Sequence, residues 1–256
     1  MDPVALTLPL GSVETVMLAS VRVAGFLVVA PPFSAKGMPG MAKVALSLAI
    51  GAAVAPRLAP LPEDSTGSFV GAVVLQAVVG LALGFGVQLV LMAVQVAGSF
   101  LDQFGGFMMG QAYDPLSQTQ VSQMGKLYTF LATALLFASD GYQIVLQGLV
   151  RTFDVLPLGV TLDPARLAER LTDSMGSMFA GALQIAGPLV IVLFLTDIGL
   201  GLLTKVAPAL NAFAMGFPLK ILITLVMVGF ALLAMDSVVR GLARDGVDFM
   251  GRVVGL

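Results

Sequence analysis

Apolar stretches alternate with short polar or proline-rich stretches along this chain, and their lengths predict helices throughout. Six apolar segments cover residues 13–30, 39–55, 69–101, 121–150, 178–196 and 217–235. The fourth is divided after residue 139 by Asp140-Gly141, a pair that favours a turn. Segments this long and this apolar predict an all-α membrane-type protein.

The third segment is the most informative, because no ionisable side chain occurs between Asp64 and Asp102. This stretch of about 37 residues would measure about 55 Å as one helix, whereas a bilayer core of about 30 Å takes roughly 20 apolar residues. We therefore expect it to tilt, bend or leave the lipid. Gly80, Gly84 and Gly86 lie near its middle, where a helix can bend and a neighbouring backbone can approach closely.

Two further stretches are amphipathic. Asp163-Pro164 predicts a helix start, and apolar side chains then recur at helical spacing up to Met178. Near the end of the chain, charged residues recur at every fourth position, namely Asp236, Arg240, Arg244, Asp248 and Arg252. A solvated helix face and a dedicated docking surface both fit this pattern.

The composition narrows the possible functions. The chain is 58% hydrophobic and 11% charged, which is typical of a membrane-type protein and not of a soluble domain. Its net charge of -2 argues against nucleic-acid binding, which needs clustered Lys and Arg. The sequence contains 0 His and 0 Cys, so the usual zinc sites, cysteine nucleophiles and His-based triads lack their atoms. We expect no catalytic, cofactor-binding or metal-binding residues.

Polar side chains interrupt the second half of the long third segment. Gln88, Gln95, Ser99 and Asp102 fall within about 40° of one another at 100° per residue, so they predict a polar stripe on one side of the helix.

The stripe leads into the sequence QFGGFMMGQAYDP at residues 103–115. Its glycines alternate with the bulky side chains of Phe104, Phe107, Met108, Met109 and Tyr113. A flexible apolar loop in this place can close a channel, because packed apolar side chains exclude water and ions yet move aside. An ordinary re-entrant turn, whose side chains fill gaps between helices, is the alternative.

Several charged residues lie within or beside apolar segments, where charge is costly unless it is paired or faces water. They are Arg22, Lys126, Asp197, Lys205 and Lys220. We expect structural pairing or helix-end positions for them; a proton relay through Asp197 or Asp102 is the alternative. Gly125-Lys126 lacks the upstream glycine and the following hydroxyl of a nucleotide-binding loop.

Residues 197–222, DIGLGLLTKVAPALNAFAMGFPLKIL, closely resemble the matching region of the FliR family of export-gate proteins. This run contains Asp197, Lys205 and Pro208, which we take as packing or pairing positions. The resemblance continues at residues 137–159, FASDGYQIVLQGLVRTFDVLPLG, and at the residues Arg22, Pro31, Pro39, Lys43, Pro56 and Asp114-Pro115. Residues 1–256 are therefore identified as one FliR-like domain.

Two local sequences bear on the branch of the family. Asp140-Gly141 together with residues 156–159 is similar to the flagellar branch rather than to its injectisome counterpart SctT. Family members commonly have Asn-Gly-His where this chain has Asp140-Gly141-Tyr142.

The resemblance implies a noncatalytic, pore-forming subunit of the flagellar type III protein-export gate. Such a subunit folds into bent helical hairpins, assembles with FliP and FliQ, is contacted by FlhB and FlhA, and conducts unfolded export substrates. The place would be the bacterial inner membrane at the flagellar basal body. Residues 103–114 would then form the plug loop that narrows the pore.

Two other classes of protein remain open. A secondary transporter or channel for a small solute should show two related halves with broken segments in corresponding places. An intramembrane enzyme would need paired carboxylates or a serine with a base. Neither pattern is evident, although the breaks near Gly84 and Gly187-Pro188 are compatible with a transporter.

Overall fold

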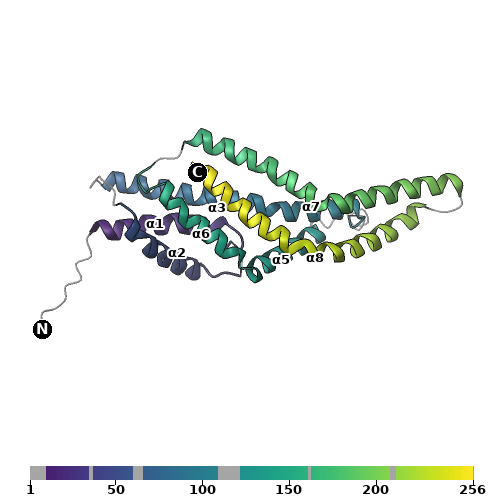
Figure 1. Ribbon diagram of the computed structural model, residues 1–256, viewed down its shortest axis with the longest axis horizontal. Helices are drawn as coiled ribbons and strands as arrows, with labels where there is room; N and C mark the ends of the chain where they lie inside the picture. The colour runs from purple at the N-terminus through teal and green to yellow at the C-terminus, as the bar shows by residue number, and fades with distance from the viewer. Residues whose placement is uncertain are drawn as a thin grey trace, which may run out of the picture. The chain divides into compact units, whose positions relative to one another are not determined.

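The computed structural model describes residues 10–34, 37–59, 66–108, 122–160, 163–207 and 212–255. Every regular element in these ranges is a helix, which confirms the predicted all-α fold (Figure 1). The elements are α1 (Leu10–Val29), α2 (Gly40–Val54), η1 (Ala55–Arg57), α3 (Thr66–Phe104), α5 (Gln123–Ala138), α6 (Gly141–Val155), α7 (Pro164–Val206) and α8 (Ala212–Val254).

The described helices also have the dimensions of a membrane protein. Four helical stretches are long and apolar enough to cross a bilayer, and α5 with α6 makes a fifth if the pair counts as one broken span. The four are Gly40–Arg57, Thr66–Phe104, Pro164–Val206 and Met215–Val254. The break between α5 and α6 falls at the predicted turn, where Asp140 has a left-handed φ of 57°.

The chain divides into two compact units. The first unit comprises residues 1–90, 142–174 and 243–256, and the second comprises residues 91–141 and 175–242. Helices α3, α7 and α8 each contribute residues to both units, because all three continue across a unit boundary.

In the first unit, α1 and α2 lie side by side (Figure 1) and meet where Gly51 faces Ser20. The core of this unit is built largely on α1, whose side chains Leu18, Val23, Phe26 and Leu27 are fully buried. In the same unit, α3 meets the end of α8 where Gly86 faces the ring of Phe249.

In the second unit, α7 and α8 form a hairpin in which Gly216 lies against Leu200. One face of α7 is buried and includes Ala182, Ala186, Leu189 and Leu193. The opposite face exposes large apolar side chains, among them Leu183, Ile191, Phe194 and Leu195.

The two amphipathic stretches are not separate helices. The first belongs to the 43-residue helix α7, which continues through the fifth apolar segment with Pro188 inside it. The second is the end of α8, which is also 43 residues long. Both helices continue through pairs that favour turns in other contexts, namely Gly187-Pro188 in α7 and Asp245-Gly246 in α8.

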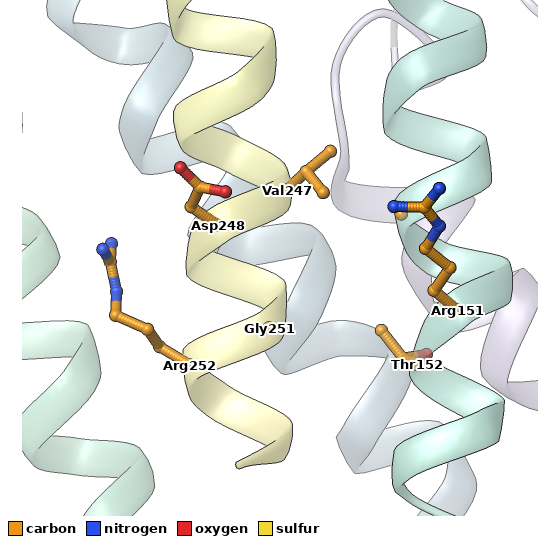
Figure 2. Close-up of a pocket in the computed structure, with 7 residues that line it drawn as sticks. Arg151, Thr152, Val247, Asp248, Gly251 and Arg252 are labelled. Carbon is orange, nitrogen blue, oxygen red and sulfur yellow. The ribbon is translucent and has the colours of Figure 1, made fainter. Parts of the chain in front are cut away.

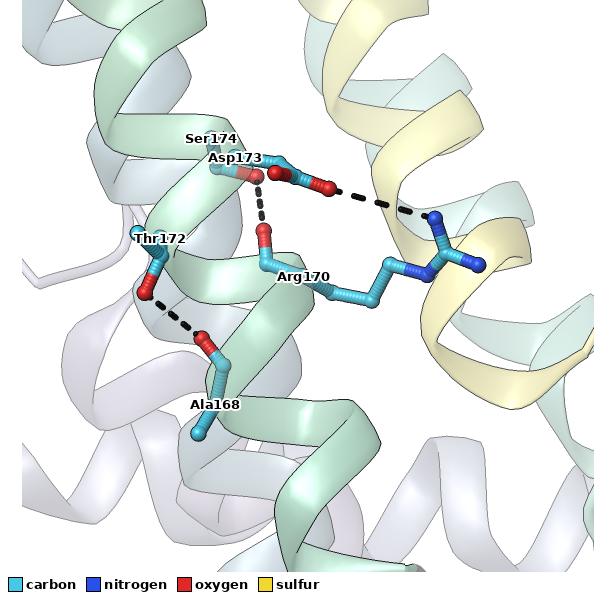
Figure 3. Close-up of polar contacts among 5 residues, drawn as sticks. All are labelled: Ala168, Arg170, Thr172, Asp173 and Ser174. Atoms are coloured by element: carbon cyan, nitrogen blue, oxygen red, sulfur yellow. Dashed lines mark hydrogen bonds and ion pairs between the residues drawn. The ribbon is translucent and has the colours of Figure 1, made fainter.

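The first turns of α7 show how such a stretch satisfies its polar groups (Figure 3). The hydroxyl of Thr172 donates to the carbonyl of Ala168, and the hydroxyl of Ser174 donates to that of Arg170. The guanidinium of Arg170 lies 4.0 Å from the carboxylate of Asp173, and both side chains are exposed. These interactions all lie within one helix.

Candidate functional site

The loop proposed to close a pore leaves the end of α3, and the chain re-enters a helix at α5. The Asp102 side chain, in the last turn of α3, is only 3% exposed. Its carboxylate accepts hydrogen bonds from the Ser122 hydroxyl (2.5 Å) and from the Met124 N–H (3.0 Å). Ser122 is the N-cap of α5, and its Oγ accepts from the Gly125 N–H (2.8 Å). Asp102 therefore binds the beginning of α5.

One helical turn before Asp102, α3 and α5 meet at two glycines. A Cβ atom placed on Gly98 would lie 2.6 Å from the Cα of Gly125 and 2.6 Å from the carbonyl oxygen of Met124. Any larger residue at position 98 would push the two backbones apart.

The predicted plug residues are only partly within the described chain. Phe104 and Met108 are 40% and 39% exposed, and Phe107 is half-buried. Met109 and Tyr113 lie outside the described residues. The closing of a pore by this loop stays a prediction.

The predicted polar stripe on α3 consists of side chains in different environments. Gln88 is half-buried, Gln95 is exposed, and Ser99 donates to the Gln95 carbonyl (3.1 Å). Only Asp102 is buried, and its carboxylate is used by α5. Ser99 and Asp102 therefore already have hydrogen-bond partners, and a shared function for the stripe stays a prediction.

Arg22 lies in the core of the first unit and is fully buried. Its Nε donates to Gln76 Oε1 (2.7 Å), and its Nη2 donates to the Leu156 carbonyl (2.8 Å). Its Nη1 reaches the Thr152 carbonyl at 3.4 Å, and the guanidinium lies 4.2 Å from the ring centre of Phe153.

The acceptors of Arg22 come from α3 and from the end of α6. A cation is favourable beside the last carbonyls of a helix, where the backbone dipoles leave partial negative charge. Gln76 in turn donates to the Leu158 carbonyl (2.9 Å). Arg22 and Gln76 together join α1, α3 and the chain just after α6.

Two of the glycines in the middle of α3 lie close to the backbone of α1. A Cβ on Gly80 would overlap the Arg22 carbonyl oxygen, and one on Gly84 would lie 2.8 Å from the Phe26 carbonyl oxygen. The described α3 is assigned as one uninterrupted helix, so the glycines serve as contact points with α1.

Asp197 has a partner that the sequence did not reveal. The Lys220 ammonium on α8 lies 2.5 Å from the Asp197 carboxylate on α7, and these side chains are 16% and 47% exposed. Lys205, near the end of α7, is exposed, and Pro208 lies outside the described residues. The role of Asp197, Lys205 and Pro208 as packing or pairing positions stays a prediction.

A cavity of about 400 Å³ lies between α6 and α8 in the first unit (Figure 2). The Arg151 side chain on α6 points toward Val247, whereas Asp248 and Arg252 extend on the other side of α8. These charged groups do not converge, so the cavity offers no single position for an anion.

Within the described part of the chain, no group of three or more acidic side chains is placed to hold a metal ion.

Sequence reasoning missed Ser122, Gly98, Gly125 and Gln76. Ser122 stands just before an apolar run, which is a helix-start signal that identifies it as a cap. Gln76 is the one polar side chain in the first half of the third apolar segment, residues 69–87, which suggests a buried hydrogen bond but not its partner.

Comparison with known proteins gives a consistent result along almost the whole chain. The family described as "Bacterial export proteins, family 1" matches residues 13–245. FliR of Bacillus subtilis (strain 168) is 25% identical over 244 residues, covering 94% of each chain. FliR of Escherichia coli (strain K12) is 31% identical over 215 residues, covering 83% of this chain and 80% of that protein.

A secretion protein is also similar. The secretion system apparatus protein SsaT of Salmonella typhimurium is 28% identical over 159 residues, covering 62% of this chain and 61% of that protein.

The apolar helices define the class as helical membrane protein. Since the family match and the FliR relatives cover most of its length, the chain belongs to the FliR family of bacterial export proteins.

Proposed function

We propose that this chain is a noncatalytic, pore-forming subunit of the flagellar type III protein-export gate in the bacterial inner membrane. In this proposal it assembles with FliP and FliQ, is contacted by FlhB and FlhA, and conducts unfolded export substrates. The observation that carries the proposal is the chain-long similarity to proteins named FliR.

The distribution of exposed apolar side chains supports assembly with other subunits. On α8, Phe230 and Leu233 are 67% and 84% exposed, and Ile191 and Phe194 on α7 are each 60% exposed. Large apolar side chains exposed in this number favour contact with lipid or protein. Neighbouring subunits as well as lipid would cover them in the proposed gate.

The chemistry of the loop after α3 supports its assignment as the plug. Phe104, Phe107 and Met108 present flexible, bulky apolar groups, and Gly105 and Gly106 lie between them. Such side chains exclude water when packed and are displaced without breaking hydrogen bonds or ion pairs.

Deleting residues 107–110 tests this function. We expect a several-fold increase in leak of a small solute through the assembled gate, with assembly unchanged, because the deletion removes apolar volume from the pore. Solute entry into vesicles that contain the purified complex measures the leak.

Replacing the same four residues with Gly-Ser-Gly-Ser is the matched control, since it keeps the length of the loop. It should leak as much as the deletion if apolar volume closes the pore. Unchanged permeability in both variants would mean that the side chains of the loop only fill gaps between helices and do not close a pore.

A separate measurement tests the alternative function. If the isolated chain were monodisperse and stable without partners, a small-solute transporter would become the better interpretation.

A further inference from the structure

One face of α7 near its end is exposed and combines apolar and charged side chains. At 100° per residue, five positions fall within about 100° of one another around the helix, and we call them the Lys205 face. Phe194 and Ile198 are 60% and 45% exposed, and Lys205 is also exposed. The face consists of Phe194, Asp197, Ile198, Gly201 and Lys205.

Most of this face is turned away from α8, the other helix of the hairpin (Figure 1). Leu200, which does not belong to the Lys205 face, lies against Gly216 of α8. A Cβ built on Gly201 would have no described atom within 4 Å. The Thr204 hydroxyl donates to the Gly201 carbonyl (2.7 Å), so this polar group is satisfied within α7. The hairpin therefore leaves the Lys205 face open.

The charges at this end of the hairpin do not cancel. Asp197 lies 2.5 Å from Lys220 of α8, so these two charges neutralise each other. Lys205 forms no ion pair within the part of the chain that the structure describes. The backbone dipole favours a cation in the last turn of a helix, but an ammonium group among apolar side chains still needs a counter-charge.

A partner that fits this face has three properties. It is apolar, so that it covers Phe194 and Ile198. It is a helix, because an open helical glycine such as Gly201 lets a second backbone approach closely. It carries a carboxylate opposite Lys205, since hydrogen bonds between charged groups are among the strongest. A lipid phosphate would supply an anion but would make no use of the close approach at Gly201.

We propose that the Lys205 face is a docking surface for a membrane helix of another subunit, and that an Asp or Glu of that helix pairs with Lys205. This inference rests on the proposed function, in which the chain assembles with other gate proteins. The pair fixes the position of the partner along α7, because a shift by one turn, about 5.4 Å, would separate the charges in apolar surroundings. Apolar contacts alone would permit such a shift.

Carbodiimide cross-linking of the complex purified with FliP and FliQ is the first test, because it joins an amine to a carboxylate where the two are in contact. We expect mass spectrometry to find Lys205 joined to an Asp or Glu of another subunit. Lys205→Arg is the control, since a guanidinium pairs with a carboxylate but does not form the amide; the complex should assemble without this cross-link. An intact complex in which Lys205 is joined to no other subunit would overturn the proposal.

Charge reversal is the second test, with all variants compared at equal amounts of this chain in the membrane. Lys205→Glu should lower the recovery of FliP and FliQ with this chain several-fold. Replacing the cross-linked acid of the partner with lysine should then restore it. Arg151→Glu, at an exposed arginine on α6, is the control and should leave recovery unchanged. Equal losses in the two reversals would refute the proposal, as would a lack of restoration, which is the result expected if Lys205 binds a lipid phosphate.

These results separate the two proposals. If the unmodified chain does not co-purify with FliP and FliQ, the proposed function is wrong. If it does co-purify but Lys205 has no carboxylate partner, the gate assembles through other surfaces and only the docking inference is wrong.

Discussion

Glycines in the middle of α3 and near the end of α7 are used in different ways. In the first unit, the missing side chains of Gly80 and Gly84 are occupied by the backbone of α1. In the second unit, Gly199 and Gly201 on α7 have no described atom within 4 Å of a Cβ built on them. Helical glycine costs roughly 0.5–1 kcal/mol relative to alanine. Packing within the described chain accounts for this cost at Gly80 and Gly84 but not at Gly199 and Gly201.

Arg22 and the Asp197–Lys220 pair show a similar contrast. Arg22 in the first unit is fully buried and bonded entirely to groups of its own unit. The Asp197–Lys220 pair in the second unit leaves the Asp197 side chain 47% exposed. The buried polar groups around Arg22 thus find their partners inside the first unit. In the α7–α8 hairpin, the Asp197 side chain stays partly exposed to its surroundings.

Among the substitutions that test this contrast, Arg22→Ala should cause the largest loss of stability. The change empties the largest fully buried side-chain position and leaves Gln76 and two backbone carbonyls without a donor. We expect a loss of about 3–5 kcal/mol, measured as a lower unfolding temperature of the purified complex. Arg151→Ala, an exposed arginine in the same unit, is the control and should change stability by less than about 0.5 kcal/mol. Equal effects of the two would contradict a self-contained core.

Substituting alanine for one helical glycine in α3 and for one in α7 tests whether their surroundings differ as described. At Gly84 the new Cβ would meet the Phe26 carbonyl oxygen at 2.8 Å, so we expect Gly84→Ala to destabilise the chain by about 1–3 kcal/mol. At Gly199 the same change should be neutral or stabilise by up to about 1 kcal/mol. Thermal unfolding of the chain in detergent measures both. Gly84→Leu should have a larger effect and also lower recovery of the complex. Similar losses at positions 84 and 199 would remove the distinction.

The smallest expected effect concerns the ion pair of the α7–α8 hairpin. A double-mutant cycle with Asp197→Asn and Lys220→Gln should give a coupling of about 0.2–1 kcal/mol, because water screens a half-exposed pair. The pair Asp163–Arg166, at 3.5 Å with side chains 52% and 85% exposed, is the control and should give less. A coupling above about 3 kcal/mol in the assembled complex would show that surrounding apolar groups desolvate the Asp197–Lys220 pair.

Much of the fold was predictable because it depends on properties local in the chain. Apolar run lengths located the helices, and Asp140-Gly141 located the break between α5 and α6, where Asp140 adopts φ 57°. Composition and the absence of His and Cys indicated a membrane-type chain and argued against the common catalytic and metal sites. The amphipathic stretches were recognised, but their continuity with α7 and α8 was not, since periodicity does not show where one helix passes into the next.

The tertiary structure alone decided which groups meet. Arg22 and Gln76 are 54 positions apart, and Arg22 and Leu156 are 134 positions apart. The sequence suggested that Asp102 is part of a polar stripe or a proton carrier. In the fold its carboxylate accepts hydrogen bonds from Ser122 and from the Met124 N–H at the beginning of α5. A buried polar group needs a partner, and so the sequence establishes that a partner exists. Its identity depends on how α1, α3, α5 and α6 pack, which no local pattern encodes.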